Sequence, residues 1–374
     1  MSTQSKNAST MASVSQAVRP GLENIVAAQT VLSHIDGVAG RLVVRGYDLD
    51  SLSSWSFEAV LALLWKDLTP VYQDVAHICE ALSRARIRAF ALVEPLLMAT
   101  KTLSHVEALR LFLSSLSDAE PEAHHIMAVA AVPVFAAAIA RRDAGLAPVA
   151  PVEGLGHAAN FLQMLHGREA SPDKVKALDT YLVSVSDHGL NASTFTARVI
   201  ASTKAGMFSS VIGALCALKG PLHGGAPGPV LDMLDAIGHE RNIHTWLANT
   251  LARGERVMGF GHRIYRVRDP RADVLKKAVG TLQRDSPRIN FAQAVEREAL
   301  SLLAEKKPLR PLETNVEFYT ALVLEAVGFP RESFTNVFAA GRMAGWTAHV
   351  LEQDQVRKLI RPQSQYVGPM PQGQ

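Results

Sequence analysis

Two histidines in glycine-rich stretches stand out as residues whose type and spacing could do chemistry. His223 lies in G-P-L-H-G-G-A, residues 220–226, and His262 lies in G-F-G-H-R-I-Y, residues 259–265. Glycines beside a histidine let the backbone approach a ligand closely, and a proline after each stretch predicts a helix start. Together with the carboxylate of Glu317 in T-N-V-E-F-Y, these residues predict two imidazoles and one base gathered around a small polar substrate.

Further cationic residues indicate an acidic ligand. Guanidinium groups bind carboxylate or phosphate in two-point fashion, and His262 is followed by a cluster of them, Arg263, Arg266, Arg268 and Arg271. His188 and Arg342 lie among small and apolar residues, where an unpaired charge is costly, so we expect a bound carboxylate as their partner. Simpler roles remain open: a turn cap for His223, a first-turn residue for Glu317 and a solvated basic face for the arginines.

The sequence lacks the signatures of several other kinds of site. The phosphate-binding pattern G-x-x-x-x-G-K-[ST] and the zinc motif H-E-x-x-H do not occur, and no predicted strand precedes G-F-G-H as a dinucleotide fingerprint requires. No cysteine or second histidine stands at ligand spacing from His223 or His262, so we predict no metal. A net charge of +3 is too small and too scattered for a nucleic-acid groove.

The elements that must position these residues are predicted to be helices. Turn residues at 35–37, followed by the strand-like residues 42–44, predict one small N-terminal β-hairpin in an otherwise all-α fold. We expect His124 and His125 on a surface turn, and a structural role for His349. Apolar residues recur at three- and four-residue spacing over residues 57–66, 71–91, 104–117, 122–142, 154–166, 172–186, 192–203, 229–237, 243–252, 271–282, 291–305, 317–327 and 331–353.

Composition fits a globular protein with more than one domain. The 374 residues exceed the usual size of a single core, and 48% are hydrophobic against 20% charged. The longest apolar run, residues 128–140, is shorter than the roughly 18 residues of a membrane span and predicts a buried helix. Two distant cysteines favour a reducing, cytoplasmic location, and the Ser- and Gln-rich residues 1–20 predict a disordered leader.

Six motifs in their order resemble those of the citrate synthase family: D-H-G-L-N-A-S-T-F, G-P-L-H-G-G-A, G-F-G-H-R-I-Y-R-V-R-D-P-R, N-V-E-F-Y, F-A-A-G-R and L-I-R-P-Q-S-Q-Y. The resemblance extends over residues 21–368, although residues 69–167 contribute little to it. It implies a homodimer of almost entirely helical, two-domain subunits with the active site between the domains. The large domain would comprise residues 21–224 and 328–374, and the small domain residues 225–327.

The resemblance also implies a role for each motif residue. His223 would hydrogen-bond the thioester oxygen of acetyl-CoA while Glu317 removes a methyl proton, and His262 would donate to the carbonyl oxygen of oxaloacetate. Oxaloacetate would be held by His188, Arg271, Arg342 and Phe338, with Arg361 contributed across the dimer interface. Coenzyme A would be bound at Arg266, Gly259 and Gly261. Acetyl-CoA would be a co-substrate, with no cofactor required, and neither nucleic acid nor membrane is an expected partner.

One position departs from the family pattern. The usual base is Asp, whereas this chain has Glu317, whose extra methylene moves the carboxylate by about 1 Å. We expect a working citrate synthase in which the local backbone or rotamer absorbs that length. A 2-methylcitrate synthase using propionyl-CoA remains an alternative, because one methylene of selectivity is worth only about 1–3 kcal/mol. A low-activity sensor that binds coenzyme A or a dicarboxylate is a third possibility.

Overall fold

A computed structural model describes residues 20–22, 25–70, 74–119, 123–224, 227–262, 265, 267–282, 286–306 and 312–371. The chain forms two compact units, one of Val31–Ile360 and one of Met1–Thr30 with Arg361–Gln374. In the second unit, the described residues form the short 3-10 helix η1 (Pro20–Leu22) and otherwise no regular element. The expected leader, apart from Pro20, lies outside the described residues.

The predicted β-hairpin is confirmed at the start of the larger unit. Strands β1 (Ser33–Asp36) and β2 (Arg41–Val44) pair antiparallel, with Ser33 opposite Val44. The turn between them forms because the Asp36 carboxylate accepts the N–H groups of the second and third residues after it, and Gly40 adopts a left-handed φ of 65°. A two-residue strand, β3 (Tyr47–Asp48), extends the sheet beyond the predicted hairpin.

The all-α fold class is confirmed, since 63% of the described residues are helical and the sheet is small. Helices α1, α4 and α10 are absent from the predicted set. The helices are α1 (Leu49–Leu52), α2 (Phe57–Trp65), α3 (Val75–Phe90), α4 (Val93–Ala99), α5 (His105–Ser114), α6 (His124–Asp143), α7 (His157–His166), α8 (Pro172–Ser184), α9 (Ala192–Ser202), α10 (Met207–Leu218), α11 (Pro227–Ile237), η2 (Glu240–Asn242), α12 (Ile243–Ala252), α13 (Pro270–Leu282), α14 (Pro287–Lys306), α15 (Val316–Val327), η3 (Arg331–Ser333) and α16 (Phe334–Val356).

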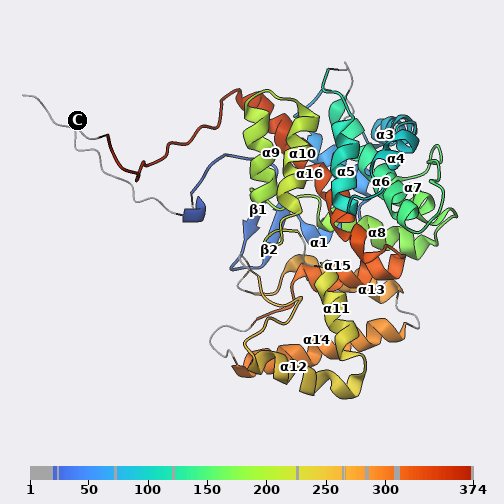
Figure 1. Cartoon of the computed structure of the whole chain (residues 1–374), viewed down its shortest axis with the longest axis vertical. Coiled ribbons are helices and arrows are strands. Elements are labelled where there is room, and N and C mark those ends of the chain that lie inside the picture. Colours follow the sequence, from blue (N-terminus) through green and yellow to red (C-terminus); the bar gives the residue numbers. More distant parts are fainter. Residues whose placement is uncertain are drawn as a thin grey trace, which may run out of the picture. The chain divides into compact units, whose positions relative to one another are not determined.

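Two long helices form the centre of the larger unit. Helix α16 is buried along most of its length and packs against α2, α5, α6, α8, α9 and α10, as Figure 1 shows. Helix α6 is apolar and long enough to cross a membrane, but 89% of its apolar window is buried inside the protein, as in a core helix. The expectation that His125 lies on a surface turn is wrong. His125 is in the first turn of α6, is 5% exposed and packs edge-on against Trp65.

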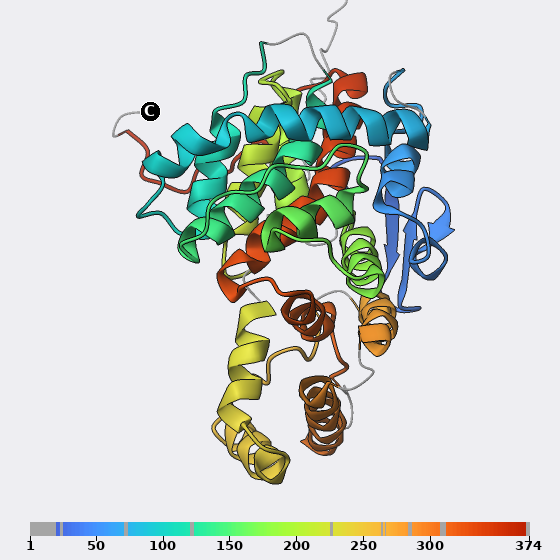
Figure 2. The same cartoon turned by 90° about the vertical axis from the view of Figure 1, so that its right-hand side faces the viewer.

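Helices α11, α12 and α14 lie together at one end of this unit, as Figures 1 and 2 show. Helices α13 and α15 lie between them and the other helices, and both pack against α8. Apart from Arg266, which is not described, and Arg361, which belongs to the other unit, the predicted site residues lie on α13, α15 and α16 or in the loops between α8 and α9, α10 and α11, and α12 and α13. The domain boundaries at residues 224/225 and 327/328 remain a prediction.

Candidate active site

The turn between α8 and α9 presents His188. The Asn191 side chain caps α9 by accepting the N–H of Thr194, and Gly189 takes a left-handed φ of 59° that reverses the chain. The His188 ring is 6% exposed, and its Nε2 lies 3.1 Å from the hydroxyl of Tyr265. Burial, helped by nearby arginine charges, lowers the pKa of His188 well below its usual value. His188 is therefore a neutral hydrogen-bonding group at neutral pH.

Helix α16 presents Arg342 beside this turn because glycine lets the two segments touch. A Cβ at Gly345 would lie 2.4 Å from the carbonyl oxygen of Ser186, and Gly345 N–H donates to that oxygen at 2.9 Å. The Arg342 Nε donates to Val185 O at 2.7 Å, and its guanidinium carbon lies 5.0 Å from the ring centre of Phe338.

No carboxylate among the described residues forms an ion pair with Arg342, although the side chain is only 2% exposed. Burial lowers the pKa of Arg342 to about 10, which reflects the cost of a buried cation. Arg342 is thus a cation whose charge a bound anion would balance.

A second buried arginine, Arg271, has a counter-ion within the chain. Its Nε and Nη2 donate to the Asp269 carboxylate at 3.0 and 2.8 Å, and its backbone N–H also donates to that carboxylate. Burial opposes the charge of Arg271, but Asp269 outweighs this effect and raises the arginine pKa. The pair holds the guanidinium rigidly at the start of α13, where it also reaches the ring of His262.

His262 lies between these groups. Its ring centre is 6.0 Å from that of His188, and its Nε2 lies 3.2 Å from Arg271 Nη2. Burial and the Arg271 charge lower the pKa of His262 to about 4, so the ring is neutral. Donors face both ring nitrogens, because the backbone N–H of Tyr265 lies 3.1 Å from Nδ1 and Arg271 Nη2 faces Nε2. One of these two contacts is therefore with a ring N–H, and an acceptor placed beside that nitrogen would receive its hydrogen bond.

His223 is held by Ser193 of α9. Its Nε2 is 2.8 Å from the Ser193 Oγ and 3.3 Å from the Ser193 backbone N–H, and the Trp346 indole donates to the same Oγ at 3.2 Å. Burial lowers the pKa of His223 to about 4, with a further contribution from the Arg342 charge. Because donors face Nε2, the proton of the neutral ring resides on Nδ1, which remains able to donate to a ligand.

The segments that carry His262 and Glu317 are bonded to each other through Asn315. Gly261 N–H donates to Glu313 O at 2.7 Å, and Asn315 N–H donates to Gly259 O at 2.9 Å. The Asn315 side chain donates to Gly261 O at 2.9 Å and accepts the N–H of Glu317 at 3.0 Å, which caps α15. One asparagine thereby fixes both the loop before His262 and the helix start that presents Glu317.

Glu317 has the properties of a general base. Its side chain is half-buried, and burial raises its pKa from 4.5 to about 7, with a further rise from Asp269. Arg271 and Arg342 act in the opposite direction, which shows that the carboxylate lies within electrostatic reach of both arginines. A carboxyl with a pKa near the working pH is well matched to proton abstraction from carbon.

The proposed coenzyme A residues fall partly within the described chain. Gly259 and Gly261 have left-handed φ angles of 87° and 83°, and a Cβ at either would press on Phe318 or Leu312. Gly261 and His262 line a cavity of about 650 Å³ that also reaches Arg256 and Lys306. A larger cavity, of about 790 Å³, contains none of the predicted site residues. Arg266 lies outside the described residues, and Arg361 is an exposed residue of the other unit.

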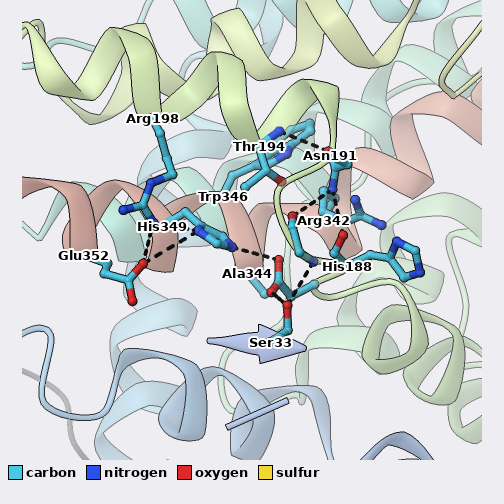
Figure 3. A network of polar contacts seen from close by, with 12 residues as sticks. Ser33, His188, Asn191, Thr194, Arg198, Arg342, Ala344, Trp346, His349 and Glu352 are labelled. Carbon is cyan, nitrogen blue, oxygen red and sulfur yellow. Dashed lines mark hydrogen bonds and ion pairs between the residues drawn. The ribbon is translucent and has the colours of Figure 1, made fainter. Parts of the chain in front are cut away.

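A buried polar network lies behind the His188 turn (Figure 3). The Ser33 hydroxyl donates to Asp187 Oδ2 at 2.5 Å, and Asp187 Oδ1 is 3.3 Å from His349 Nε2. Arg198 donates to His349 Nδ1 at 3.0 Å and forms an ion pair with Glu352. Although burial raises the pKa of Asp187, His349 and Ser33 outweigh it and keep the carboxylate ionised. The network holds the carboxylate of Asp187, the residue directly before His188.

Several of these supporting residues had no predicted role. Asp187, Ser193 and Asp269 stand inside the motifs D-H-G-L-N-A-S-T-F and R-V-R-D-P-R or next to them, but a motif does not show which neighbour an acidic or hydroxyl side chain will bind. The available signal was that Asp187 directly precedes His188 and that Asp269 stands two residues before Arg271. Among the described residues, no group of three or more His, Cys, Asp and Glu side chains is arranged to hold a metal ion.

Comparison with known proteins gives the family. The model "Citrate synthase, C-terminal domain" matches residues 21–363. The chain is 38% identical to citrate synthase of Haloferax volcanii, over 94% of this chain and 96% of that protein, and 34% identical to 2-methylcitrate synthase of Mycobacterium tuberculosis, over 94% and 91%. The citrate synthase of Thermoplasma acidophilum, solved with carboxymethyl coenzyme A and oxaloacetate, superimposes with a TM-score of 0.84 at 26% identity, covering 95% of this chain and 97% of that one. The chain, an acyltransferase, belongs to the citrate synthase family.

Proposed function

We propose that this enzyme condenses acetyl-CoA with oxaloacetate and water to give citrate and coenzyme A, with His223, Glu317 and His262 as its catalytic residues. The observation that carries the proposal is a carboxyl with a pKa of about 7, Glu317, within electrostatic reach of two buried arginines. A thioester methyl group is only weakly acidic, so its base needs a hydrogen-bond donor aimed at the developing enolate oxygen. The Nδ1–H of neutral His223 is that donor.

Oxaloacetate occupies the arginine side of the site in this proposal. Its two carboxylates bind Arg342 and Arg271, and His188 donates to the same ligand. The lack of an ion pair for buried Arg342 among the described residues supports this assignment, because a dianion would add a direct partner to the more distant Asp187 and Glu317 charges. Phe338 packs against the Arg342 guanidinium and lines the same side.

The three steps follow from these positions. Glu317 removes a proton from the acetyl methyl group while His223 stabilises the enol form. The methyl carbon attacks the keto carbon, whose oxygen takes a proton from His262, and the proton held by Glu317 then returns to this histidine through water, so that both groups are restored. Water then hydrolyses the thioester bond, which releases coenzyme A and citrate. Acetyl-CoA is a substrate throughout, so the scheme uses no cofactor.

Coenzyme A is assigned to the cavity of about 650 Å³ beside His262. Gly261 lines this cavity, and the cations of Arg256 and Lys306 suit the phosphates of coenzyme A. Gly259 is proposed as a backbone contact on motif grounds. Arg266 is proposed as a further phosphate contact on motif grounds alone.

A homodimer in which Arg361 reaches the neighbouring subunit, and a cytoplasmic location, complete the proposal. The motif L-I-R-P-Q-S-Q-Y supports the first, and the two free cysteines Cys79 and Cys216 support the second.

Thiol release from acetyl-CoA tests the proposed reaction. Purified protein should release coenzyme A only when oxaloacetate is present, and Glu317→Gln should abolish the release. No oxaloacetate-dependent release from the unaltered protein would refute the function and favour a low-activity sensor. Equal release by Glu317→Gln would show that Glu317 is not the base.

The 2-methylcitrate synthase reaction stays a second candidate because a relative of that name shares 34% identity with the chain. Both reactions use the same catalytic set, so the shape of the acyl pocket decides between them. Measuring kcat/KM for acetyl-CoA and propionyl-CoA with the same preparation distinguishes the two. A higher value for propionyl-CoA would overturn the assignment to citrate synthesis.

A further inference from the structure

A single hydroxyl of the N-terminal hairpin binds both residues that flank His188. Ser33, the first residue of β1, donates to the Asp187 carboxylate at 2.5 Å and accepts the backbone N–H of Gly189 at 2.9 Å. Figure 3 shows Ser33 on its strand directly beside the turn of His188. The hydroxyl therefore fixes the backbone on either side of the histidine without touching its ring.

The same hairpin also contacts the loop that carries His262 and Arg271, two further residues proposed to bind oxaloacetate. A Cβ at Gly40, in the hairpin turn, would lie 2.7 Å from Val267 Cγ2 and 3.2 Å from the carbonyl oxygen of Arg268. These residues lie between His262 and Arg271. Ile35 of strand β1 packs on Gly189 of the His188 turn, since a Cβ at Gly189 would lie 3.2 Å from Ile35 Cδ1.

The hairpin thus touches the two segments that supply His188 on one hand and His262 with Arg271 on the other. We propose that hairpin β1–β2 is a positioning element of the oxaloacetate site, in which Ser33 fixes the His188 turn and the turn at Gly40 supports the His262–Arg271 loop. The inference rests on the proposed function, because it names the ligand whose binding the hairpin controls.

The expected effect is selective. Ser33 makes no contact with His223 or Glu317, so its loss should weaken oxaloacetate binding without slowing proton abstraction. Ser33 makes two hydrogen bonds, one of them to a carboxylate. If both help to hold His188 in place for oxaloacetate, their loss should raise the oxaloacetate Kd about tenfold. Gly40→Ala should act in the same direction, because the new methyl group would push on the Val267–Arg268 backbone.

Each variant has a matched control. Ser56→Ala removes a serine that accepts the N–H of Ala59 at the start of α2, so it loses a hydroxyl without touching the His188 turn. Gly145 has a φ of 70°, close to the 65° of Gly40, and a Cβ there would meet nothing within 4 Å. Gly145→Ala therefore introduces the same backbone strain as Gly40→Ala without the contact.

The test measures Kd for oxaloacetate by calorimetry and the KM of both substrates with the full-length protein. We expect Ser33→Ala and Gly40→Ala to raise the oxaloacetate Kd and KM about five- to tenfold, with kcat and the acetyl-CoA KM within about twofold. Ser33→Thr, which keeps the hydroxyl, should restore most of the affinity. Ser56→Ala and Gly145→Ala should leave the Kd and the KM for oxaloacetate unchanged.

A double variant separates positioning from a general loss of stability. In a His188→Gln background, Ser33→Ala should change the oxaloacetate KM by less than about twofold, because Ser33 acts through the His188 turn. An unchanged oxaloacetate Kd in Ser33→Ala, or an equal effect in both backgrounds, would overturn the proposal. Failure of the unaltered protein to bind oxaloacetate would instead refute the proposed function, which distinguishes the two failures.

Discussion

Replacing Glu317 by glutamine should abolish turnover and make the protein more stable. The carboxyl has a pKa of about 7 in the folded chain against its usual 4.5, and burial is the main cause. The folded state therefore holds the proton more tightly than the unfolded chain does, and ionising the group at high pH destabilises the fold. Glutamine resembles the protonated carboxyl and has no charge to bury, so the variant escapes this penalty.

The size and pH range of the effect follow from the two pKa values. The difference between 4.5 and about 7 corresponds to about 3 kcal/mol at pH 8, at about 1.4 kcal/mol per pKa unit. The stabilisation of Glu317→Gln should fall to about 2 kcal/mol at pH 6 and below about 0.5 kcal/mol at pH 4.5, where both states hold the proton.

Denaturant unfolding of the ligand-free protein at these three pH values, at one protein concentration, checks the prediction. Glu153→Gln is the control, because Glu153 is exposed and surface changes of this kind have effects within about 0.5 kcal/mol. A gain for Glu317→Gln that does not change with pH would refute the reasoning, since packing rather than the buried charge would then explain it. Loss of stability at pH 8 would also refute it, because Glu317 would then be ionised and stabilised in the folded state.

Three further outcomes are expected. With oxaloacetate saturating, kcat/KM for acetyl-CoA should decrease as the pH is lowered, with an apparent pKa above 7. The reason is that the bound dianion offsets the Arg271 and Arg342 charges, which otherwise lower the pKa of Glu317. A pH–rate profile that decreases only below pH 5 would identify another base. Arg342→Met should raise the melting temperature by removing a buried cation without an ion pair, and oxaloacetate should no longer stabilise the variant; a melting temperature that still rises with oxaloacetate would contradict the assignment. Gly345→Ala should lower the free energy of unfolding by about 1–3 kcal/mol, because its Cβ would lie 2.4 Å from Ser186 O. It should also raise the oxaloacetate KM in steady-state kinetics. Unchanged stability would mean that α16 can shift away from Ser186.

The helices were predictable wherever one face of the element meets water. Period 3.6 identifies α3 and α5, which have both buried and exposed residues, and also α7 and α9, whose buried residues alternate with partly exposed ones. Helix α10 was missed because M-F-S-S-V-I-G-A-L-C-A-L is apolar nearly throughout, and it packs against α5, α6, α9 and α16, which leaves little polar pattern to detect. The misplacement of His125 has a related cause: a polar residue type suggested the surface, whereas in the folded chain this ring is buried and packs edge-on against Trp65.

The site residues were identifiable as members of motifs, but their pairing was not. The sequence places Asp269 two residues before Arg271, but it does not show that the two side chains pair, or that Arg342 has no ion-pair partner among the described residues. The tautomers of His223 and His262 likewise depend on which donors fold against each ring. Such contacts join residues distant in sequence, as between Ser193 and His223, and only the folded chain defines them.

The distribution of charges suggests why the keto acid should bind before the thioester. The groups of the site belong to two sets. Helices α8–α10 and α16 hold His188, His223 and Arg342. The hydrogen bonds of Asn315, together with α13, hold His262, Arg271 and Glu317. Among the described residues, His188 and Tyr265 form a direct polar contact between the segments that carry the two sets. A dicarboxylate that bridges Arg342 and Arg271 would join the two sets and, by offsetting both cations, strengthen Glu317 as a base. The base is then strongest only when the acceptor for the new carbon–carbon bond is in place, which limits unproductive enolisation of acetyl-CoA.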